Sequence, residues 1–277
     1  MLRIGHNQNT NMLPMFYFLS QGNPDLDWVI GQPTTHNKLL AEGKIDLAPI
    51  SAFSYGEHWR DYAILPDLSV STKGRVGSIL LFTKYPLKEL DGRKVALTSH
   101  SATSVNLVKV ILKEFYHCMP EYVIMDAGLP EMMAEADAGL LIADQAIQAS
   151  LSKPEAQIID LGEEWFRQTG CPMTFSVWAY PKYLIHEKGE EIRNIHELLI
   201  SGRNKALNHM DEIVNTCVQM LGATSDFWVD YFNQFSYTLD SELQRGLSRY
   251  FEYCVKYGQL EEQPEILIWP EDLGLRE

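Results

Sequence analysis

Hydroxyl and amide side chains gather where predicted strands begin or end, and these residue types are suited to holding an anion. The positions are Asn11, Ser51, Ser78, Ser99, Ser101, Thr103 and Ser104. In open α/β sheets, ligands bind outside the carboxyl ends of the strands, so such loops are expected to face one cleft. Neutral donors at helix N-termini bind carboxylates, whereas proton abstraction usually needs a positioned His, Glu or Asp. One interpretation of this pattern is a carboxylate-binding cleft without an obvious protein base.

The stretch 94–115 shows this pattern most clearly. Residues 94–97 predict a short buried strand, a hydroxyl-rich loop follows, and apolar residues recur at helical spacing from Val105 to Phe115. The first-turn N–H groups of a helix lie at the positive end of its dipole, which favours an anion there. Ser and Thr are also ordinary N-cap residues, so an anion site and a simple helix cap both remain open interpretations.

Two further residues carry alternative interpretations. Asp144 follows an apolar run, where it is either a catalytic base or a residue that caps the next helix or bonds loop amides; we favour the structural role. Trp178, together with Phe175, either walls an aromatic pocket or belongs to the core. We nevertheless include both Asp144 and Trp178 among the expected substrate-binding residues.

No metal or cofactor motif is found. The eight histidines show no H-x-x-x-H or H-E-x-x-H spacing, and no G-x-S-x-G, P-loop or G-x-G-x-x-G motif is present. We therefore expect no metal, and the common hydrolase, nucleotidase and dinucleotide-binding interpretations are removed. The sequence leaves open whether Arg3, Arg75, His6 or His100 contacts the ligand.

Composition and charge narrow the possible partners. The chain has 277 residues, 45% of them hydrophobic, and a formal net charge of -14. Nucleic acid and anionic membranes demand clustered Lys and Arg, so neither is expected as a partner. The four cysteines form no C-x-x-C pair and suggest free thiols in a reducing compartment. The early apolar run 12–19 is a poor signal peptide and no segment reaches about 20 apolar residues, so we expect a cytoplasmic protein.

Strand and helix patterns alternate over most of the chain and become helical after about residue 190, which predicts an α/β architecture. Several motifs, in chain order, resemble the chorismate dehydratases of the futalosine route to menaquinone. They lie at residues 3–6, 11–14, 74–78, 95–104, 141–144, 160–162 and 176–179, with Trp165, Thr169, Gly170 and Pro172. Each motif is weak alone, but the ordered set is specific and covers the chain to about residue 180.

The resemblance implies a periplasmic-binding-protein-like fold of type two, with a ligand cleft between two α/β lobes. We expect residues 1–85 and 178–277 in the first lobe and 86–177 in the second. It also implies loss of water from chorismate to give 3-[(1-carboxyvinyl)oxy]benzoate, with no metal or organic cofactor. Asn11 and Ser78 would orient chorismate at the reacting centre, and the substrate's own enolpyruvyl carboxylate would act as base. The Thr103–Ser104 helix start would receive a carboxylate.

The sequence departs from the family pattern at two places: the loop 7–10 is polar, and Ala143 stands where glycine is usual. Two alternatives remain. The same fold serves solute-binding proteins, here for a small carboxylate. The related dihydroxynaphthoate synthases typically place a catalytic histidine where this chain has Asp144, which favours the dehydratase. The sequence does not predict an oligomeric state.

Overall fold

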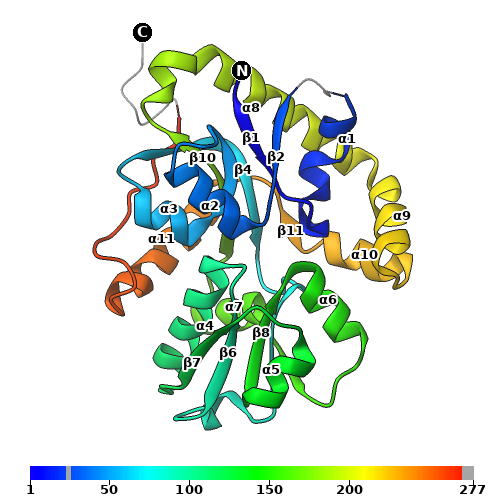
Figure 1. Ribbon diagram of the computed structural model, residues 1–277, viewed down its shortest axis with the longest axis vertical. Coiled ribbons are helices and arrows are strands. Elements are labelled where there is room, and N and C mark those ends of the chain that lie inside the picture. Colours follow the sequence, from blue (N-terminus) through cyan, green and yellow to red (C-terminus); the bar gives the residue numbers. More distant parts are fainter. Residues whose placement is uncertain (23–25, 270–277) are drawn as a thin grey trace.

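The computed structural model describes residues 1–22 and 26–269, which form two α/β lobes, one above the other in Figure 1. The chain crosses between the lobes twice, from β4 to β5 and from α7 to β10. Both crossings contain glycines with positive φ: Gly74 and Gly77 in the first, Gly170 in the second. Glycine adopts this left-handed backbone without steric cost, so these residues let the chain turn sharply between the lobes.

The first lobe is built on a four-stranded sheet with the order β11-β4-β10-β3. Strand β10 lies in its middle, antiparallel to both β3 and β4. The parallel pair β1-β2 joins this lobe through a bridge between Ile4 and Leu47. The strand bounds are β1 Arg3–His6, β2 Asp27–Ile30, β3 Ala48–Ser51, β4 Tyr62–Thr72, β10 Met173–Pro181 and β11 Phe235–Ser236.

Helices cover this sheet, and most of the C-terminal third of the chain consists of them (Figure 1). The helical pattern expected after about residue 190 is confirmed by α8 to α11. In the last of these, the Asp240 carboxylate caps the helix by accepting from the Leu243 N–H at 2.9 Å, and the apolar face is buried. The bounds are η1 Thr10–Met12, α1 Leu13–Gly22, α2 Pro33–Ala41, α3 Ala52–His58, α8 Leu184–Asn208, α9 Met210–Leu221, α10 Ser225–Phe232 and α11 Ser241–Lys256.

The second lobe has a five-stranded sheet with the order β7-β6-β8-β5-β9. Strands β6, β7 and β8 are parallel, and β5 runs antiparallel between β8 and β9. The strand bounds are β5 Ile79–Thr83, β6 Lys94–Thr98, β7 Glu121–Met125, β8 Ala138–Ile142 and β9 Gln157–Asp160. The helices are η2 Leu87–Glu89, α4 Ala102–Phe115, α5 Leu129–Glu135, α6 Ala143–Leu151 and α7 Leu161–Thr169.

Strand pairing corrects the expected lobe boundaries. Strand β5, expected in the first lobe, pairs with β8 and β9 of the second. Residues 173–177, expected in the second lobe, begin β10 and pair with β4 of the first. All five residues of β5 are buried, as is usual for an inner strand covered on both faces. Apolar runs reveal strands but not their partners, which is why the boundaries differ. Residues 270–277 of the expected first lobe lie outside the described residues.

Candidate active site

A narrow cavity of about 60 Å³ lies between the two lobes. We call it the interlobe cleft. Its walls are Asn7, Asn9, Asn11, Met12, Pro33, Pro49, Ser51, Val70, Ser78, Ile79, Ser101, Ser104, Ile142, Ala143, Phe175 and Ser176. None of these described residues carries a formal charge. The cleft therefore offers amides, hydroxyls and apolar surface.

Four helices, two from each lobe, begin at residues that line the cleft. Pro33 is the first residue of α2, Ser51 the N-cap of α3, Ser101 the N-cap of α4 and Ala143 the first residue of α6. The N-terminus of a helix carries a partial positive charge and N–H groups without intrahelical partners. Because these helix starts converge on one cavity, the cleft favours an anion even without a cationic side chain.

Ser78 and Asn11 both line the cleft, as expected. Ser78 is buried, and its Oγ accepts a hydrogen bond from the Tyr231 hydroxyl at 2.9 Å. The Asn11 backbone carbonyl accepts from the Tyr237 hydroxyl at 2.9 Å, which fixes the chain beside the side chain. Among the described residues, Asn11 Oδ1 is buried and has no hydrogen-bond partner. This oxygen therefore has its full capacity to accept a hydrogen bond, on a residue that lines the cleft.

Of the four predicted hydroxyl residues at the start of α4, two line the cleft and two do not. Ser101 and Ser104 line the cleft, where Ser101 Oγ accepts from the Ser104 N–H at 3.1 Å. Thr103 faces the first lobe instead: its Oγ1 accepts from the Phe53 N–H at 3.0 Å and donates to the Phe175 carbonyl at 3.2 Å. Ser99 is half-buried and is not among the lining residues. Ser101 is thus a helix cap that also faces the cleft.

Ser51 lies at the cleft with its hydroxyl already bonded. Its Oγ accepts from the Ser54 N–H at 3.2 Å and from Asn37 Nδ2 at 3.0 Å. A serine hydroxyl that accepts two bonds still has its own hydrogen to donate. Asn37 therefore orients Ser51 from behind, which fits a donor role toward a ligand.

Asp144 bonds the opposite lobe. Its Oδ1 accepts from the Thr10 N–H at 3.0 Å and from the Thr10 hydroxyl at 2.6 Å. Burial raises the pKa of Asp144, and the two bonds from Thr10 oppose that rise. Asp144 is therefore a contact between the lobes that bonds a loop amide, in line with the favoured structural role, and it is absent from the cleft walls.

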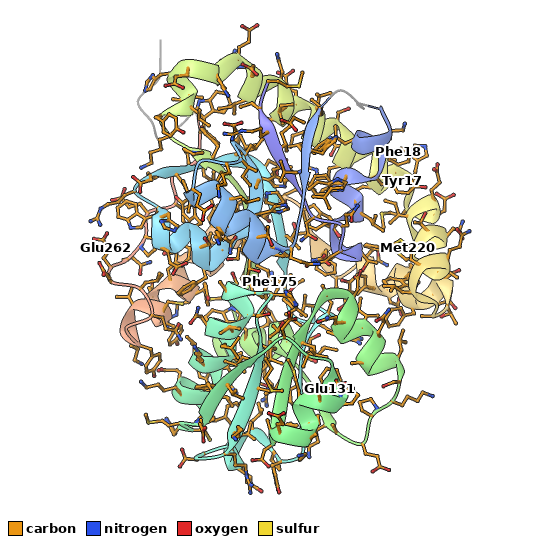
Figure 2. All side chains as sticks on the ribbon, in the orientation of Figure 1. Tyr17, Phe18, Glu131, Phe175, Met220 and Glu262 are labelled. Atoms are coloured by element: carbon orange, nitrogen blue, oxygen red, sulfur yellow. The ribbon has the colours of Figure 1, made fainter. Side chains whose placement is uncertain are left out.

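Phe175 and Trp178 lie on opposite faces of β10. Phe175 lines the cleft and lies between the two lobes (Figure 2). Trp178 is 1% exposed and belongs to the first-lobe core, with its ring centroid 5.5 Å from that of Phe16. The structure therefore gives Phe175, and not Trp178, a place at the cleft.

The four residues left open by the sequence all lie outside the cleft walls. Arg3 pairs with Asp46 at 3.0 Å, and Arg75 lines a neighbouring cavity. The His6 ring packs on Phe16 at 4.2 Å, and burial lowers the pKa of His6. His100 Nε2 lies 2.8 Å from Asp126 Oδ1. None of the four is needed to build the cleft.

Sequence reasoning missed several polar residues of the cleft. Asn7 and Asn9 come from the polar loop 7–10, which stood out as a departure from the family pattern. Ser176 follows Phe175 at an irregularity in the pairing of β10 with β4. Tyr231 bonds Ser78 from a distant helix, and no local pattern marks it.

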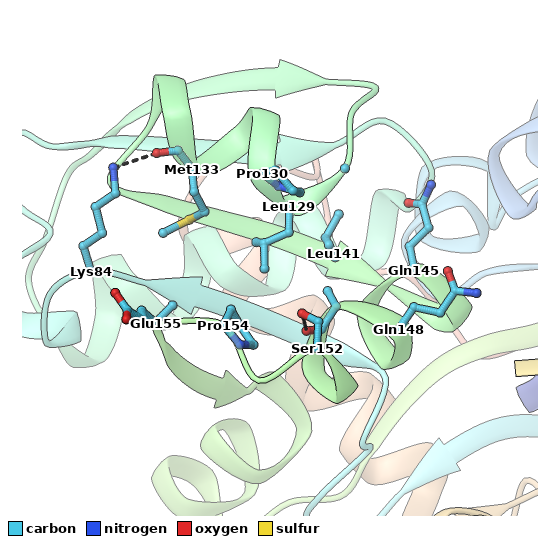
Figure 3. Close-up of a pocket in the computed structure, with 13 residues that line it drawn as sticks. Lys84, Leu129, Pro130, Met133, Leu141, Gln145, Gln148, Ser152, Pro154 and Glu155 are labelled. Carbon is cyan, nitrogen blue, oxygen red and sulfur yellow. Dashed lines mark hydrogen bonds between the residues drawn. The ribbon is translucent and has the colours of Figure 1, made fainter. Parts of the chain in front are cut away.

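A larger cavity of about 550 Å³ lies in the second lobe, between α5, α6 and the segment after α6 (Figure 3). Its inner wall is apolar, with Leu129, Met133 and Leu141, and Gln145 and Gln148 lie on α6 beside it. Lys84 also lines it, but the Lys84 ammonium donates to the Met133 and Ala136 carbonyls at 2.7 and 2.8 Å. We call it the second-lobe cavity; none of the predicted site residues lines it.

Within residues 1–22 and 26–269, no group of three or more His, Cys, Asp or Glu side chains is arranged to hold a metal ion. In the same part of the chain, no helix is both long and apolar enough to cross a membrane.

The fold and the cleft define a two-lobed α/β protein of the periplasmic-binding-protein type. Solved structures share this fold. A protein from Archaeoglobus fulgidus has a TM-score of 0.75 at 20% identity, covering 94% of this chain and 98% of that one. The periplasmic aliphatic sulphonate binding protein of Escherichia coli has a TM-score of 0.66 at 14% identity, covering 96% and 90%. The expected fold class is confirmed.

The family model described as menaquinone biosynthesis matches residues 2–256, and the chain belongs to this family. The chain is 31% identical over 265 residues to the chorismate dehydratase of Thermus thermophilus, covering 90% of this chain and 93% of the relative. It is 27% identical over 281 residues to the 1,4-dihydroxy-6-naphtoate synthase of the same organism, covering 96% and 98%. The resemblance drawn from the motifs is confirmed.

Proposed function

We propose that this protein is a chorismate dehydratase, a lyase that removes water from chorismate to give 3-[(1-carboxyvinyl)oxy]benzoate. The observation that carries the proposal is the convergence of the N-termini of α2, α4 and α6, together with the Ser51 hydroxyl, on a cleft without charged side chains. Chorismate has two carboxylates, and such a cleft holds them with amides, hydroxyls and helix dipoles. The identity with a chorismate dehydratase supports the same substrate.

The described walls of the cleft contain no Asp, Glu, His or Lys side chain that could remove the ring proton of the substrate. We propose that the enolpyruvyl carboxylate of chorismate removes the ring proton and passes it to the departing hydroxyl, which leaves as water. The electron pair of the broken C–H bond enters the ring, which becomes aromatic, so the elimination is strongly downhill. The enzyme then needs chiefly to hold the substrate in its reactive conformation.

Asn11 and Ser78 supply that positioning in this account. Asn11 Oδ1 is unbonded within the described chain and accepts from the substrate, while Ser78 Oγ accepts from Tyr231 and so keeps its hydrogen for donation. Ser51, Ser101 and Ser104 add hydroxyls at the helix starts. We assign no direct substrate contact to Ser99, Thr103, Asp144 or Trp178.

The two alternatives predict different behaviour. A solute-binding protein would bind a carboxylate without converting it. A naphthoate synthase of the related type would place a base where this chain has Asp144, but that carboxylate is taken by Thr10 of the opposite lobe. The dehydratase therefore fits the cleft best.

The lobes must separate for chorismate to enter. The cleft holds about 60 Å³, whereas pockets for small molecules usually hold about 300–1,000 Å³. The two glycine-bearing crossings are suited to such a motion. We therefore regard the structure as a closed form.

A cytoplasmic location fits the four cysteines, all of which are free thiols.

Incubation of the purified protein with chorismate tests the proposal. The ultraviolet spectrum should acquire the absorbance of an aromatic product whose mass is lower than that of chorismate by one water. Tight binding of chorismate without product would support a solute-binding protein and overturn the proposal. A parallel reaction with Asn11→Ala checks that product formation depends on the cleft.

A further inference from the structure

Tyr231 connects the distant C-terminal segment to the cleft. It lies on α10, is 2% exposed, and its hydroxyl donates to Ser78 Oγ at 2.9 Å across 153 positions of sequence. Its ring packs against Trp228 and Phe235, with centroids 5.5 and 5.0 Å away. A Cβ added at Gly77 would lie only 3.1 Å from the Tyr231 ring. The hydroxyl is therefore held firmly beside the crossing that carries Ser78.

The partner of this hydroxyl sets Tyr231 apart from other buried tyrosines. The hydroxyls of Tyr55, Tyr237 and Tyr250 donate to the backbone carbonyls of Glu265, Asn11 and Thr103. Such bonds satisfy a buried hydroxyl and stabilise the fold. Tyr231 instead donates to a side-chain hydroxyl that lines the cleft.

This bond has a directional consequence for Ser78. A serine hydroxyl has one hydrogen and two lone pairs, and it rotates to suit its partners. When Tyr231 donates to one lone pair, the Ser78 hydrogen must point elsewhere. Burial raises the pKa of Tyr231, so its hydroxyl keeps the proton it donates.

The same region contains the contact between the lobes. Thr10 donates to Asp144 through both its N–H and its hydroxyl. Hydrogen bonding by the Thr10 side chain also opposes part of the rise that burial causes in the pKa of Tyr231. Polar groups of both lobes therefore lie around the Tyr231 hydroxyl in this structure. Tyr231 is well placed to act on Ser78 when the cleft is closed.

We propose that Tyr231 is a positioning residue for the dehydration: by donating to Ser78 Oγ, it turns the Ser78 hydroxyl hydrogen into the cleft toward the substrate. This inference rests on the proposed function. Tyr231 does not touch the reacting atoms in this account, and it acts only through Ser78.

The test is a double-mutant cycle on the full-length protein with chorismate as substrate. Tyr231→Phe removes only the hydroxyl, and kcat should fall about 3- to 10-fold, the fold-change that corresponds to the net contribution of one hydrogen bond, with KM changed less than about threefold. In the Ser78→Ala background, Tyr231→Phe should have no further effect, because the group on which it acts is gone.

Tyr55→Phe is the matched control. It deletes the same atom from another buried tyrosine, one that bonds the backbone at Glu265 and Leu267, and kcat should stay within twofold of the wild type. Thermal unfolding of each variant separates a loss of fold from a loss of positioning. Should Tyr231→Phe fail to fold, 3-fluorotyrosine at position 231 keeps the ring and the hydroxyl. Its more acidic hydroxyl is a stronger donor to Ser78 Oγ and should raise kcat above that of the wild type.

The outcomes are distinct. Wild-type protein that forms no aromatic product overturns the proposed function and this inference together. Wild-type turnover with an unchanged kcat for Tyr231→Phe, or for the fluorotyrosine protein, overturns only the inference. Multiplicative losses from Tyr231→Phe and Ser78→Ala would also overturn it, since they would show that Tyr231 acts independently of Ser78.

Discussion

The interlobe cleft is smaller than the second-lobe cavity, but more of its lining residues are polar. The cleft holds about 60 Å³, and polar groups from both lobes converge on it. The second-lobe cavity holds about 550 Å³, but its inner wall is apolar and its lysine is bonded to backbone carbonyls (Figure 3). A substrate with two carboxylates needs donors more than space. The comparison teaches that donor convergence, and not volume, marks the candidate site.

Ser78→Ala should give the largest effect. It removes the hydroxyl that we propose donates to the substrate, and donors placed at a reacting centre are commonly worth about 100-fold or more in kcat. Gln148→Ala in the second-lobe cavity is the control and should leave kcat/KM for chorismate unchanged. A steady-state assay of both variants checks this. Equal losses in the two variants would break the distinction between the cavities.

Thr10→Val should weaken closure of the cleft. The change removes the hydroxyl that bonds Asp144 at 2.6 Å, and a bond to a charged group is worth about 1.5–3 kcal/mol. The KM for chorismate should rise about tenfold, since 1.4 kcal/mol is a factor of ten. Thr216→Val is the control, because that hydroxyl bonds the Glu212 carbonyl on α9. An unchanged KM for Thr10→Val would contradict the role of this contact.

Asp144→Asn should change how stability depends on pH. Burial raises the pKa of Asp144 above its ordinary value of 3.8, so the folded protein binds this proton more tightly than the unfolded chain. The corresponding stability is present below pH 3.8 and is lost as the pH rises through the raised pKa. Relative to Asp144→Asn, the wild type should therefore lose stability over that rise. Urea unfolding at several pH values measures the difference, and parallel curves would refute this view of Asp144.

Ala143→Gly should give the smallest effect, a stabilisation of about 1 kcal/mol or less. Ala143 has φ of 50°, in the left-handed region that favours glycine. Ala146→Gly, within the same helix, is the control and should destabilise the protein by about 1 kcal/mol. Urea unfolding of both variants checks the opposite signs. A destabilised Ala143→Gly would show that the backbone at this cleft residue is not strained.

Part of the cleft follows from one rule, that polar loops where strands begin or end face the space between the lobes. Asn11, Ser51, Ser78, Ser101 and Ser104 line the cleft, and their roles toward a substrate stay predictions. The positive φ of Ala143 explains why glycine is usual at this position, since glycine adopts that backbone without strain. Polar residues where strands begin or end, and the residue type at position 143, can be read from a single sequence because each depends only on nearby residues.

What the sequence did not predict depends on packing between distant segments. Trp178 was expected beside Phe175, but side chains alternate along a strand, and residues three apart face opposite ways. Hydroxyl content could not show that Thr103 turns to the backbone of the first lobe. The Tyr231 contact with Ser78 spans 153 positions and has no local signal.

The most direct test of the account is the formation of aromatic product from chorismate by three proteins in one assay: the wild type, Asn11→Ala and Gln148→Ala. The account predicts product from the wild type and from Gln148→Ala at equal rates, and a rate reduced about 100-fold or more for Asn11→Ala. Absence of product from the wild type, or equal rates from all three proteins, would contradict the claim that the interlobe cleft dehydrates chorismate.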